Sequence, residues 1–278
     1  MINYDDLRDV LNTDLRTPIP ASTISKLISL PPFITIPGVS NFPALSYDNN
    51  IRPGYVYRSG NLSGITQEGK GIIAADLGIT TVFDLRNEGE RVKAPSPQIE
   101  GVDTIWMPYS TSPASLSLLD FAGEDQGVNG FVKMYTGILE ASASAFAQVF
   151  SHIKDQPNDP FIFHCSAGKD RTGVLAALIF LLMGRSRDDI INDYILTRVG
   201  LENMRENLTQ ALALDAGTDN LSPEAIGMLE LSGVRAHAMA AFLKTFEDTY
   251  DGGVKGYLTT KLGFSHEEVK LMHNNLLA

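Results

Sequence analysis

The stretch FIFHCSAGKDRTG, residues 161–173, contains the only cysteine of this 278-residue chain. Its first five residues, FIFHC, are rich in aromatic and β-branched side chains and follow Pro160, which is typical of a short buried strand. Residues 171–183 are apolar on every side of a helix, so they predict a buried helix that ends at Gly184. The loop at 166–170 joins the two into the strand–turn–helix unit of an α/β protein.

The rest of the chain alternates between predicted strands and helices. We expect strands at residues 55–58, 80–86 and 103–108, helices at 66–77, 131–153 and 186–199, and mostly helical sequence from 201 to 278 with breaks at 217–223 and 252–253. A polar loop is expected at 110–130. This alternation predicts an α/β fold with a largely parallel central sheet flanked by helices. We expect one domain over residues 1–278, with an N-terminal extension (1–38) and a helical insert or lid at 200–245.

Composition and charge restrict the classes of partner. The chain carries 33 acidic residues against 22 lysines and arginines, a net charge of -11, which argues against non-specific binding to nucleic acids or anionic membranes. A single cysteine excludes an intrachain disulfide and fits a reducing compartment. The first residues lack the apolar run of a signal peptide, and the longest apolar run, 174–183, is too short to cross a bilayer. We therefore expect a cytoplasmic protein without integral membrane association.

The loop after Cys165 has the properties of an anion site. Ligands of open α/β sheets bind beyond the carboxyl ends of the strands, where a helix N-terminus offers free N–H groups and a positive dipole end. Gly168 permits a turn that directs loop N–H groups inward. The same field favours the thiolate of Cys165, and Arg171 can reach back to grip an anion. An inert buried cysteine is the alternative, but cysteine-dependent phosphoryl transfer needs this spacing of Cys, Gly, Arg and Thr.

The segment HCSAGKDRTG (164–173) resembles the Cys-x5-Arg signature of the protein-tyrosine phosphatase superfamily, in the form found in a bacterial and fungal branch of tyrosine/serine phosphatases. Four further stretches resemble that branch: RPGYVYRSGNLSGIT (52–66), LGITTVFDLRNEGE (77–90), IINDYILT (190–197) and YDGGVKGYLTTKLGFSHEEV (250–269). The resemblance covers about residue 39 to the C-terminus and is weak at 110–158 and 201–246. Beside Asn41 and Phe42, Pro43 and Ala44 replace the Arg and Asp of the branch, which removes any contact made by those two side chains.

The resemblance implies roles for individual residues. Cys165 would be the nucleophile and Arg171 the phosphate clamp. Asp84 is the first choice for the general acid that protonates the leaving oxygen, because it ends a strand within the DLR motif, and Asp170 is the second choice. The residues expected to surround the phosphate, chiefly through backbone amides, are Ser166, Ala167, Gly168, Lys169, Asp170 and Thr172. The residues expected to support the loop are His164, Arg86 and Glu90.

For some of these residues the sequence leaves two roles open. Thr172 could also donate its hydroxyl hydrogen to the thiolate. Lys169 suits a polyanionic substrate such as a phosphoinositide, or it serves only the loop or pairs with an acid. Arg58 and Asn61 lie either near the pocket or in packing and turn positions.

The sequence therefore predicts a phosphomonoester hydrolase with a phosphocysteine intermediate that needs no metal or other cofactor. Phosphotyrosine in proteins is the favoured substrate class, with phosphoserine/threonine, phosphoinositides and phosphorylated small molecules left open. Two rival classes are a binding-only pseudophosphatase and a sulfur-transfer protein with a similar cysteine loop. No nucleic-acid partner is expected, and the sequence gives no oligomeric state.

Overall fold

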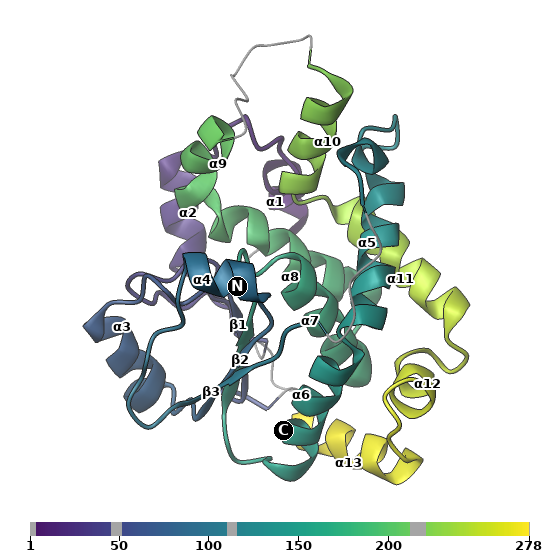
Figure 1. Ribbon diagram of the computed structural model, residues 1–278. Helices are drawn as coiled ribbons and strands as arrows, with labels where there is room; N and C mark the ends of the chain where they lie inside the picture. Colours follow the sequence, from purple (N-terminus) through teal and green to yellow (C-terminus); the bar gives the residue numbers. More distant parts are fainter. Residues whose placement is uncertain (1–3, 46–51, 110–115, 212–220, 278) are drawn as a thin grey trace.

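The computed structural model describes residues 4–45, 52–109, 116–211 and 221–277. These residues contain one sheet of four parallel strands, β1 (Val56–Ser59), β2 (Thr81–Asp84), β3 (Asp103–Trp106) and β4 (Phe161–His164), in the order β1-β4-β2-β3. Figure 1 labels β1, β2 and β3 of this sheet. The predicted α/β fold with a parallel central sheet is confirmed.

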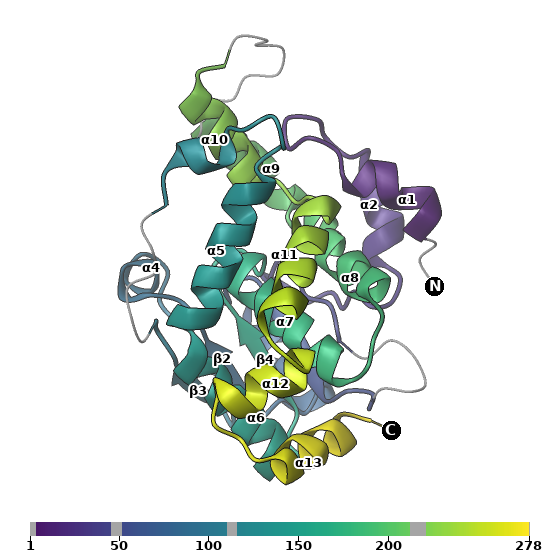
Figure 2. The same cartoon turned by 90° about the vertical axis from the view of Figure 1, so that its right-hand side faces the viewer.

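Helices surround this sheet. Their bounds are α1 (Tyr4–Leu11), α2 (Ala21–Ile28), α3 (Gln67–Gly71), the π-helical turn η1 (Ile72–Asp76), α4 (Glu88–Lys93), the 3₁₀ turn η2 (Leu118–Phe121), α5 (Val128–Ala141), α6 (Ala143–Asp155), α7 (Asp170–Leu182), α8 (Arg187–Gly200), η3 (Glu202–Met204), α9 (Arg205–Ala211), α10 (Pro223–Ser232), α11 (Ala236–Thr249), α12 (Gly253–Thr260) and α13 (His266–Leu276). Helices α5, α7, α8 and α11 pack side by side (Figure 2).

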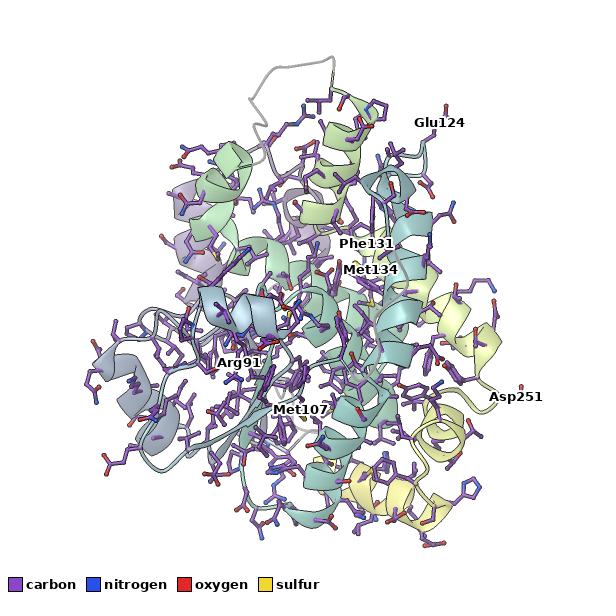
Figure 3. All side chains as sticks on the ribbon, viewed as in Figure 1. Arg91, Met107, Glu124, Phe131, Met134 and Asp251 are labelled. Atoms are coloured by element: carbon purple, nitrogen blue, oxygen red, sulfur yellow. The ribbon has the colours of Figure 1, made fainter. Side chains whose placement is uncertain are left out.

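Successive side chains of the central strand enter two apolar layers. Phe161 and Phe163 of β4 belong to the larger layer, together with residues of α5 to α8 and α11 to α13. Ile162 points to the other side of the sheet, where it packs with Val82 and with Ile73 of η1. This alternation is the period of two expected of a strand that is buried on both faces. In Figure 3, Met107 and Phe131 lie inside the fold, and both are buried.

The strand register sets the position of the candidate site. Ser59, His164 and Asp84 are register partners at the carboxyl ends of β1, β4 and β2. The loop that follows β4 therefore emerges between the ends of two neighbouring strands, which is where open α/β sheets bind ligands.

Some helix boundaries differ from the sequence expectation. The segment 131–153 forms two helices, α5 and α6, that meet at Ser142, and η2 lies within the expected 110–130 loop. Helix α4 was not expected, although Asn87 and Glu90 form a capping box that marks its start. The break expected at 217–223 lies partly outside the described residues.

The N-terminal extension contains α1 and α2, both in contact with α8. Residues 200–245 are largely helical where the structure describes them, and their action as a lid stays a prediction. No helix in the described part of the chain is both long enough and apolar enough to cross a membrane.

Candidate active site

Cys165 lies between the end of β4 and the start of α7, and it is only 2% exposed. We call residues 165–171 the Cys165 loop. At Gly168 the backbone has a φ of +71°, and an added Cβ would lie 2.5 Å from the carbonyl oxygen of Ser59. Only glycine combines this left-handed conformation with so close an approach to β1. The loop is therefore held tightly against the neighbouring strand.

Three side chains from outside the loop hold its carbonyl groups. Asn41 donates through Nδ2 to the carbonyl oxygens of Ala167 (3.1 Å) and Gly168 (3.2 Å). Asn61 donates its backbone N–H to the carbonyl of Ser166 at 2.9 Å, and its side chain donates there as well. Arg58 donates through Nη1 to the carbonyl of Gly168 at 3.3 Å.

This outward hold determines where the loop N–H groups point. In a trans peptide, a carbonyl and the next residue's N–H point in opposite directions. The N–H groups of residues 167–169 thus face the inside of the loop, and within the described residues they donate to no protein acceptor. Inward N–H groups at the start of a helix form a site for a phosphate-sized anion.

Arg58 is itself fixed by a buried ion pair. Its Nε lies 3.0 Å from Oδ2 of Asp193 on α8, and its Nη2 donates to the Asp193 carbonyl at 2.7 Å. Burial raises the pKa of Asp193, and the charge of Arg58 opposes that effect. Helix α8 is therefore tied to the loop through Arg58. The sequence does not decide whether Arg58 and Asn61 lie near the pocket or serve in packing and turns. It predicts no role for Asn41 or Asp193.

Glu90 of α4 orients Arg171. Its two carboxylate oxygens accept hydrogen bonds from Nη1 (2.6 Å) and Nη2 (2.5 Å) of Arg171, and Ser166 donates its hydroxyl to the same carboxylate at 2.6 Å. Burial would raise the pKa of Glu90, but the hydrogen bonds and charge of Arg171 lower it to about 2. Glu90 is therefore an anion at neutral pH. It occupies one edge of the guanidinium, and its supporting role in the reaction stays a prediction.

The other edge of the Arg171 guanidinium is available for a ligand. Nη1 also donates to the carbonyl of Leu85 at 3.1 Å, which uses both of its hydrogens. The Nε hydrogen and the second Nη2 hydrogen have no acceptor among the described residues. These two donors form the planar fork that binds two oxygens of one phosphate.

Asp84 does not have the surroundings of a general acid. It is fully buried, and Arg86 donates to it from Nε (2.9 Å) and Nη2 (2.8 Å). Ser96 donates at 2.7 Å, and Arg91 lies 3.2 Å away. Burial would raise the pKa of Asp84, but the hydrogen bonds of Arg86 and the other neighbours lower it to about 2.

These surroundings argue against Asp84 as the general acid, and the identity of the acid stays a prediction. The lowered pKa makes Asp84 harder to protonate than an ordinary carboxyl group, and no part of its side chain is exposed to reach a leaving group. Asp84 instead anchors Arg86, which also donates to the carbonyl of Ala94 just after α4. Sequence reasoning placed Asp84 at the correct edge of the sheet but could not show the cations that surround it.

Asp170, the second choice, has a more suitable position. It is the first residue of α7, and its side chain is 27% exposed. Its Oδ1 accepts a hydrogen bond from the Tyr135 hydroxyl at 3.1 Å and lies 3.5 Å from Nζ of Lys169. Its Oδ2 has no partner among the described residues. Asp170 lines a cavity of about 210 Å³ together with Arg171.

Lys169 points away from the loop interior. Its ammonium donates to the carbonyl oxygens of Leu231 and of Gly233, the latter at 3.0 Å, where α10 ends. It also lies 5.2 Å from the centre of the Phe131 ring. Its side chain is only 4% exposed, so Lys169 joins the loop to α10 in this conformation. These contacts favour a structural role for Lys169 in the loop over a role in binding a polyanionic substrate.

Two further predicted residues lie against the loop. His164 is buried and forms a hydrogen bond through Nδ1 with the carbonyl of Cys165 at 3.0 Å. Because the partner is a carbonyl, Nδ1 carries the hydrogen, and burial lowers the pKa of His164, which favours the neutral ring. Thr172 is also buried, and its hydroxyl has no hydrogen-bond partner among the described residues, Cys165 included.

The cavity beside Asp170 and Arg171 has mostly apolar walls. Its lining residues are Tyr109, Leu116, Lys133, Met134, Gly137, Ile138, Asp170 and Arg171. The Tyr109 ring also lies 5.6 Å from the Arg171 guanidinium carbon. Burial is the main cause that raises the pKa of Tyr109 to about 12, so its hydroxyl remains protonated. Sequence reasoning missed this wall because Tyr109 and α5 lie far from Cys165 in the chain.

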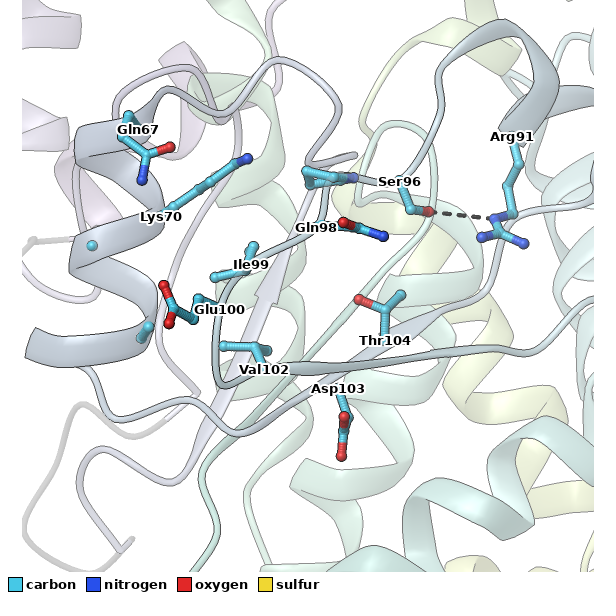
Figure 4. A pocket seen from close by; sticks show the side chains of 13 residues that line it. Gln67, Lys70, Arg91, Ser96, Gln98, Ile99, Glu100, Val102, Asp103 and Thr104 are labelled. Atoms are coloured by element: carbon cyan, nitrogen blue, oxygen red, sulfur yellow. Dashed lines mark hydrogen bonds between the residues drawn. The ribbon is translucent and has the colours of Figure 1, made fainter.

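A larger groove of about 920 Å³ lies elsewhere, between α3 and residues 96–104. Lys70 and Arg91 face it from opposite sides (Figure 4). Neither Cys165 nor Arg171 lines this groove, although Arg91 and Ser96 join it to the network around Asp84. Asp170 and Arg171 line the smaller cavity, and neither of them lines the larger groove.

Comparison with known proteins identifies the family. Residues 35–278 match the model of the tyrosine phosphatase family. The triple specificity protein phosphatase PtpB of Mycobacterium tuberculosis is 27% identical over 280 residues, covering 87% of this chain and 98% of the relative. A tyrosine-protein phosphatase of Nostoc commune is 28% identical over 218 residues, covering 77% of this chain and 71% of the relative.

One similar solved structure is a yeast phosphatase domain. The core catalytic domain of the PP-IP phosphatase SIW14 from S. cerevisiae has a TM-score of 0.34 and 15% identity, covering 60% of this chain and 94% of the other. The family match does not depend on it, because that match spans the sheet, the Cys165 loop and the helices that hold the loop. The chain therefore belongs to the tyrosine phosphatase family.

Proposed function

We propose that this phosphatase hydrolyses phosphomonoesters through a phosphocysteine intermediate at Cys165. The proposal rests on the hydrogen bonds by which residues outside the loop hold the carbonyls of Ser166, Ala167 and Gly168 outward. It leaves a ring of N–H donors beside Cys165, and the free edge of Arg171 completes that ring. Such pre-oriented donors stabilise charge on the phosphoryl oxygens without reorganisation during the reaction.

In the first step the Cys165 thiolate attacks phosphorus, the S–P bond forms, and the bond from phosphorus to the leaving oxygen breaks. Asp170 gives its proton to that oxygen. In the second step water attacks phosphorus, the S–P bond breaks, and Asp170 takes a proton from the water. Asp170 replaces Asp84 in this role because it has one oxygen free and lines the cavity beside Arg171.

We propose phosphotyrosine as the preferred substrate class. The apolar wall formed by Tyr109, Met134 and Ile138 beside Arg171 suits the ring of an aryl phosphate. The curated relatives are named for tyrosine or triple specificity, so phosphoserine/threonine and phosphoinositides are the alternatives to be measured. Lys169 is held by backbone carbonyls, which argues against a second phosphate beside it in this conformation.

Rapid acid quenching of the enzyme during turnover of a ³²P-labelled phosphotyrosine peptide tests the mechanism. We expect label bound to the wild-type chain and none on Cys165→Ser, which should still bind inorganic phosphate. Turnover by Cys165→Ser at the wild-type rate would disprove the covalent mechanism. Absence of phosphate release by the wild type would favour a binding-only protein. Values of kcat/KM for phosphopeptides, a soluble phosphoinositide and phosphorylated metabolites rank the substrate classes.

A further inference from the structure

A chain of buried hydroxyl groups ends at Asp170. Tyr135 of α5 is 0% exposed, and its hydroxyl contacts Oδ1 of Asp170 at 3.1 Å and the Tyr194 hydroxyl of α8 at 2.7 Å. The Tyr135 ring is enclosed by Phe131, Tyr194 and Phe242, whose ring centres lie 5.5–6.3 Å away. Two helices thus fix one hydroxyl against one carboxylate oxygen.

The direction of these hydrogen bonds follows from donor counting. An ionised carboxylate only accepts hydrogen bonds, so Tyr135 must donate its single hydrogen to Asp170. Tyr135 can then only accept from Tyr194, and Tyr194 is the donor of that pair. Burial raises the pKa of both tyrosines, so both hydroxyls keep their hydrogens at neutral pH.

The two oxygens of Asp170 therefore differ. Oδ1 faces the Tyr135 hydroxyl and the ammonium of Lys169, so a proton placed there would compete with two donors. Oδ2 has neither neighbour. We propose that Tyr135, held by Tyr194, is a positioning residue that keeps the transferable proton of Asp170 on Oδ2 and prevents the carboxyl group from rotating.

This inference rests on the proposed function, in which Asp170 is the general acid and then the base. Both steps need the same oxygen at the same place: Oδ2 releases a proton to the leaving group and later accepts one from water. Tyr135 keeps its own hydrogen throughout. Loss of its hydroxyl should therefore affect proton transfer more than phosphate binding.

The test compares two substrates. Phenyl phosphate has a strongly basic leaving group that needs a proton, whereas 4-nitrophenyl phosphate releases a weak base that needs little help. For Tyr135→Phe we expect kcat on phenyl phosphate to fall roughly ten-fold, the loss typical of one hydrogen bond to a charged group. The loss on 4-nitrophenyl phosphate should be much smaller. KM and inhibition by inorganic phosphate should hardly change.

Tyr257→Phe is the matched control. Tyr257 is a buried tyrosine whose hydroxyl donates to the carbonyl of Leu139 at 3.0 Å, and within the described part of the chain it has no hydrogen bond with Asp170. Loss of the Tyr257 hydroxyl should lower the stability of the protein and change kcat by the same factor for both substrates. Tyr194→Phe should give a smaller loss in the same direction as Tyr135→Phe, and it serves as the second variant if Tyr135→Phe does not fold.

Asp170→Asn separates the inference from the proposed function. If Asp170→Asn loses activity mainly on phenyl phosphate but both Tyr135→Phe and Tyr194→Phe treat the substrates alike, the positioning role is wrong and the function stands. If Asp170→Asn itself shows no dependence on the leaving group, the acid assignment fails and the positioning role fails with it. A selective loss in Asp170→Asn and in either tyrosine variant supports both.

Discussion

Replacement of Glu90 by glutamine should loosen Arg171 and slow the enzyme. Glutamine keeps one carbonyl acceptor but loses the charge and the second oxygen that hold the guanidinium edge. The drop in the pKa of Glu90 from 4.5 to about 2 corresponds to roughly 3 kcal/mol. Because the Glu90 side chain is 26% exposed, solvent screens part of this, and we expect about 2 kcal/mol in the free energy of unfolding.

Two measurements test this prediction: kcat/KM for an aryl phosphate, and the free energy of unfolding as a function of pH. We expect kcat/KM for an aryl phosphate to fall roughly ten- to a hundred-fold, since one charged contact that orients the transition-state ligand is lost. The pKa of Glu90 is depressed on folding, so its contribution is complete above about pH 4.5 and is lost as the pH falls towards about 2. Urea unfolding at a series of pH values should show the wild type and Glu90→Gln converging over that range.

Glu88→Gln is the matched control for this prediction, because Glu88 is an exposed residue on the same helix. It should keep wild-type kinetics and lose only a few tenths of a kcal/mol, as for one surface charge near a helix N-terminus. If Glu90→Gln behaves like Glu88→Gln in both measurements, the reasoning that Glu90 orients Arg171 is refuted.

Three further outcomes follow from the same contacts. Asp84→Asn leaves buried Arg86 without its counter-charge, so urea unfolding should show a loss of about 3–5 kcal/mol in the free energy of unfolding. The dependence of kcat on the leaving group should stay as in the wild type, and a loss of kcat confined to phenyl phosphate would instead identify Asp84 as the acid. Lys169→Ala should lower kcat/KM equally for a phosphotyrosine peptide and a soluble phosphoinositide, and a loss confined to the phosphoinositide would contradict the loop role. Asn41→Asp cannot donate to the loop carbonyls, so competitive inhibition by inorganic phosphate should weaken roughly ten-fold, and unchanged inhibition would oppose the outward hold.

The sequence predicted the parts of the site that are local in the chain. The strand at 161–165, the glycine turn and the helix from 171 are each set by neighbouring residues, so spacing together with the family resemblance pointed to Cys165 and Arg171. The strand 80–86 likewise placed Asp84 at the same sheet edge, and the structure ends that strand at Asp84 itself. Local patterns therefore specify which side chains emerge where ligands bind.

Other features of the site depend on how the chain folds around each side chain, which spacing does not give. Arg86 and Arg91 pair with Asp84 and Ser96 donates a hydrogen bond to it, an arrangement of nearby residues that no spacing rule gives. Tyr135 reaches Asp170 only because α5 packs against α7. Residue type and strand position cannot distinguish a free carboxyl group from one that is already surrounded by cations.

The distribution of cations around the Cys165 loop bears on the number of phosphates that the site can hold. Arg58 is paired with Asp193, Arg86 with Asp84, and Lys133 of the cavity wall with Asp120 at 3.0 Å. Lys169 is occupied by the carbonyls at the end of α10. Arg58, Arg86 and Lys169 would each have to give up buried partners before binding a second phosphate, which costs free energy, whereas the exposed Lys133–Asp120 pair costs little to break. Arg171 differs because Glu90 takes one edge of its guanidinium and leaves the other edge with two donors. This arrangement supports the proposed preference for one aryl phosphate, because one fork and one set of inward N–H groups lie beside a mostly apolar wall.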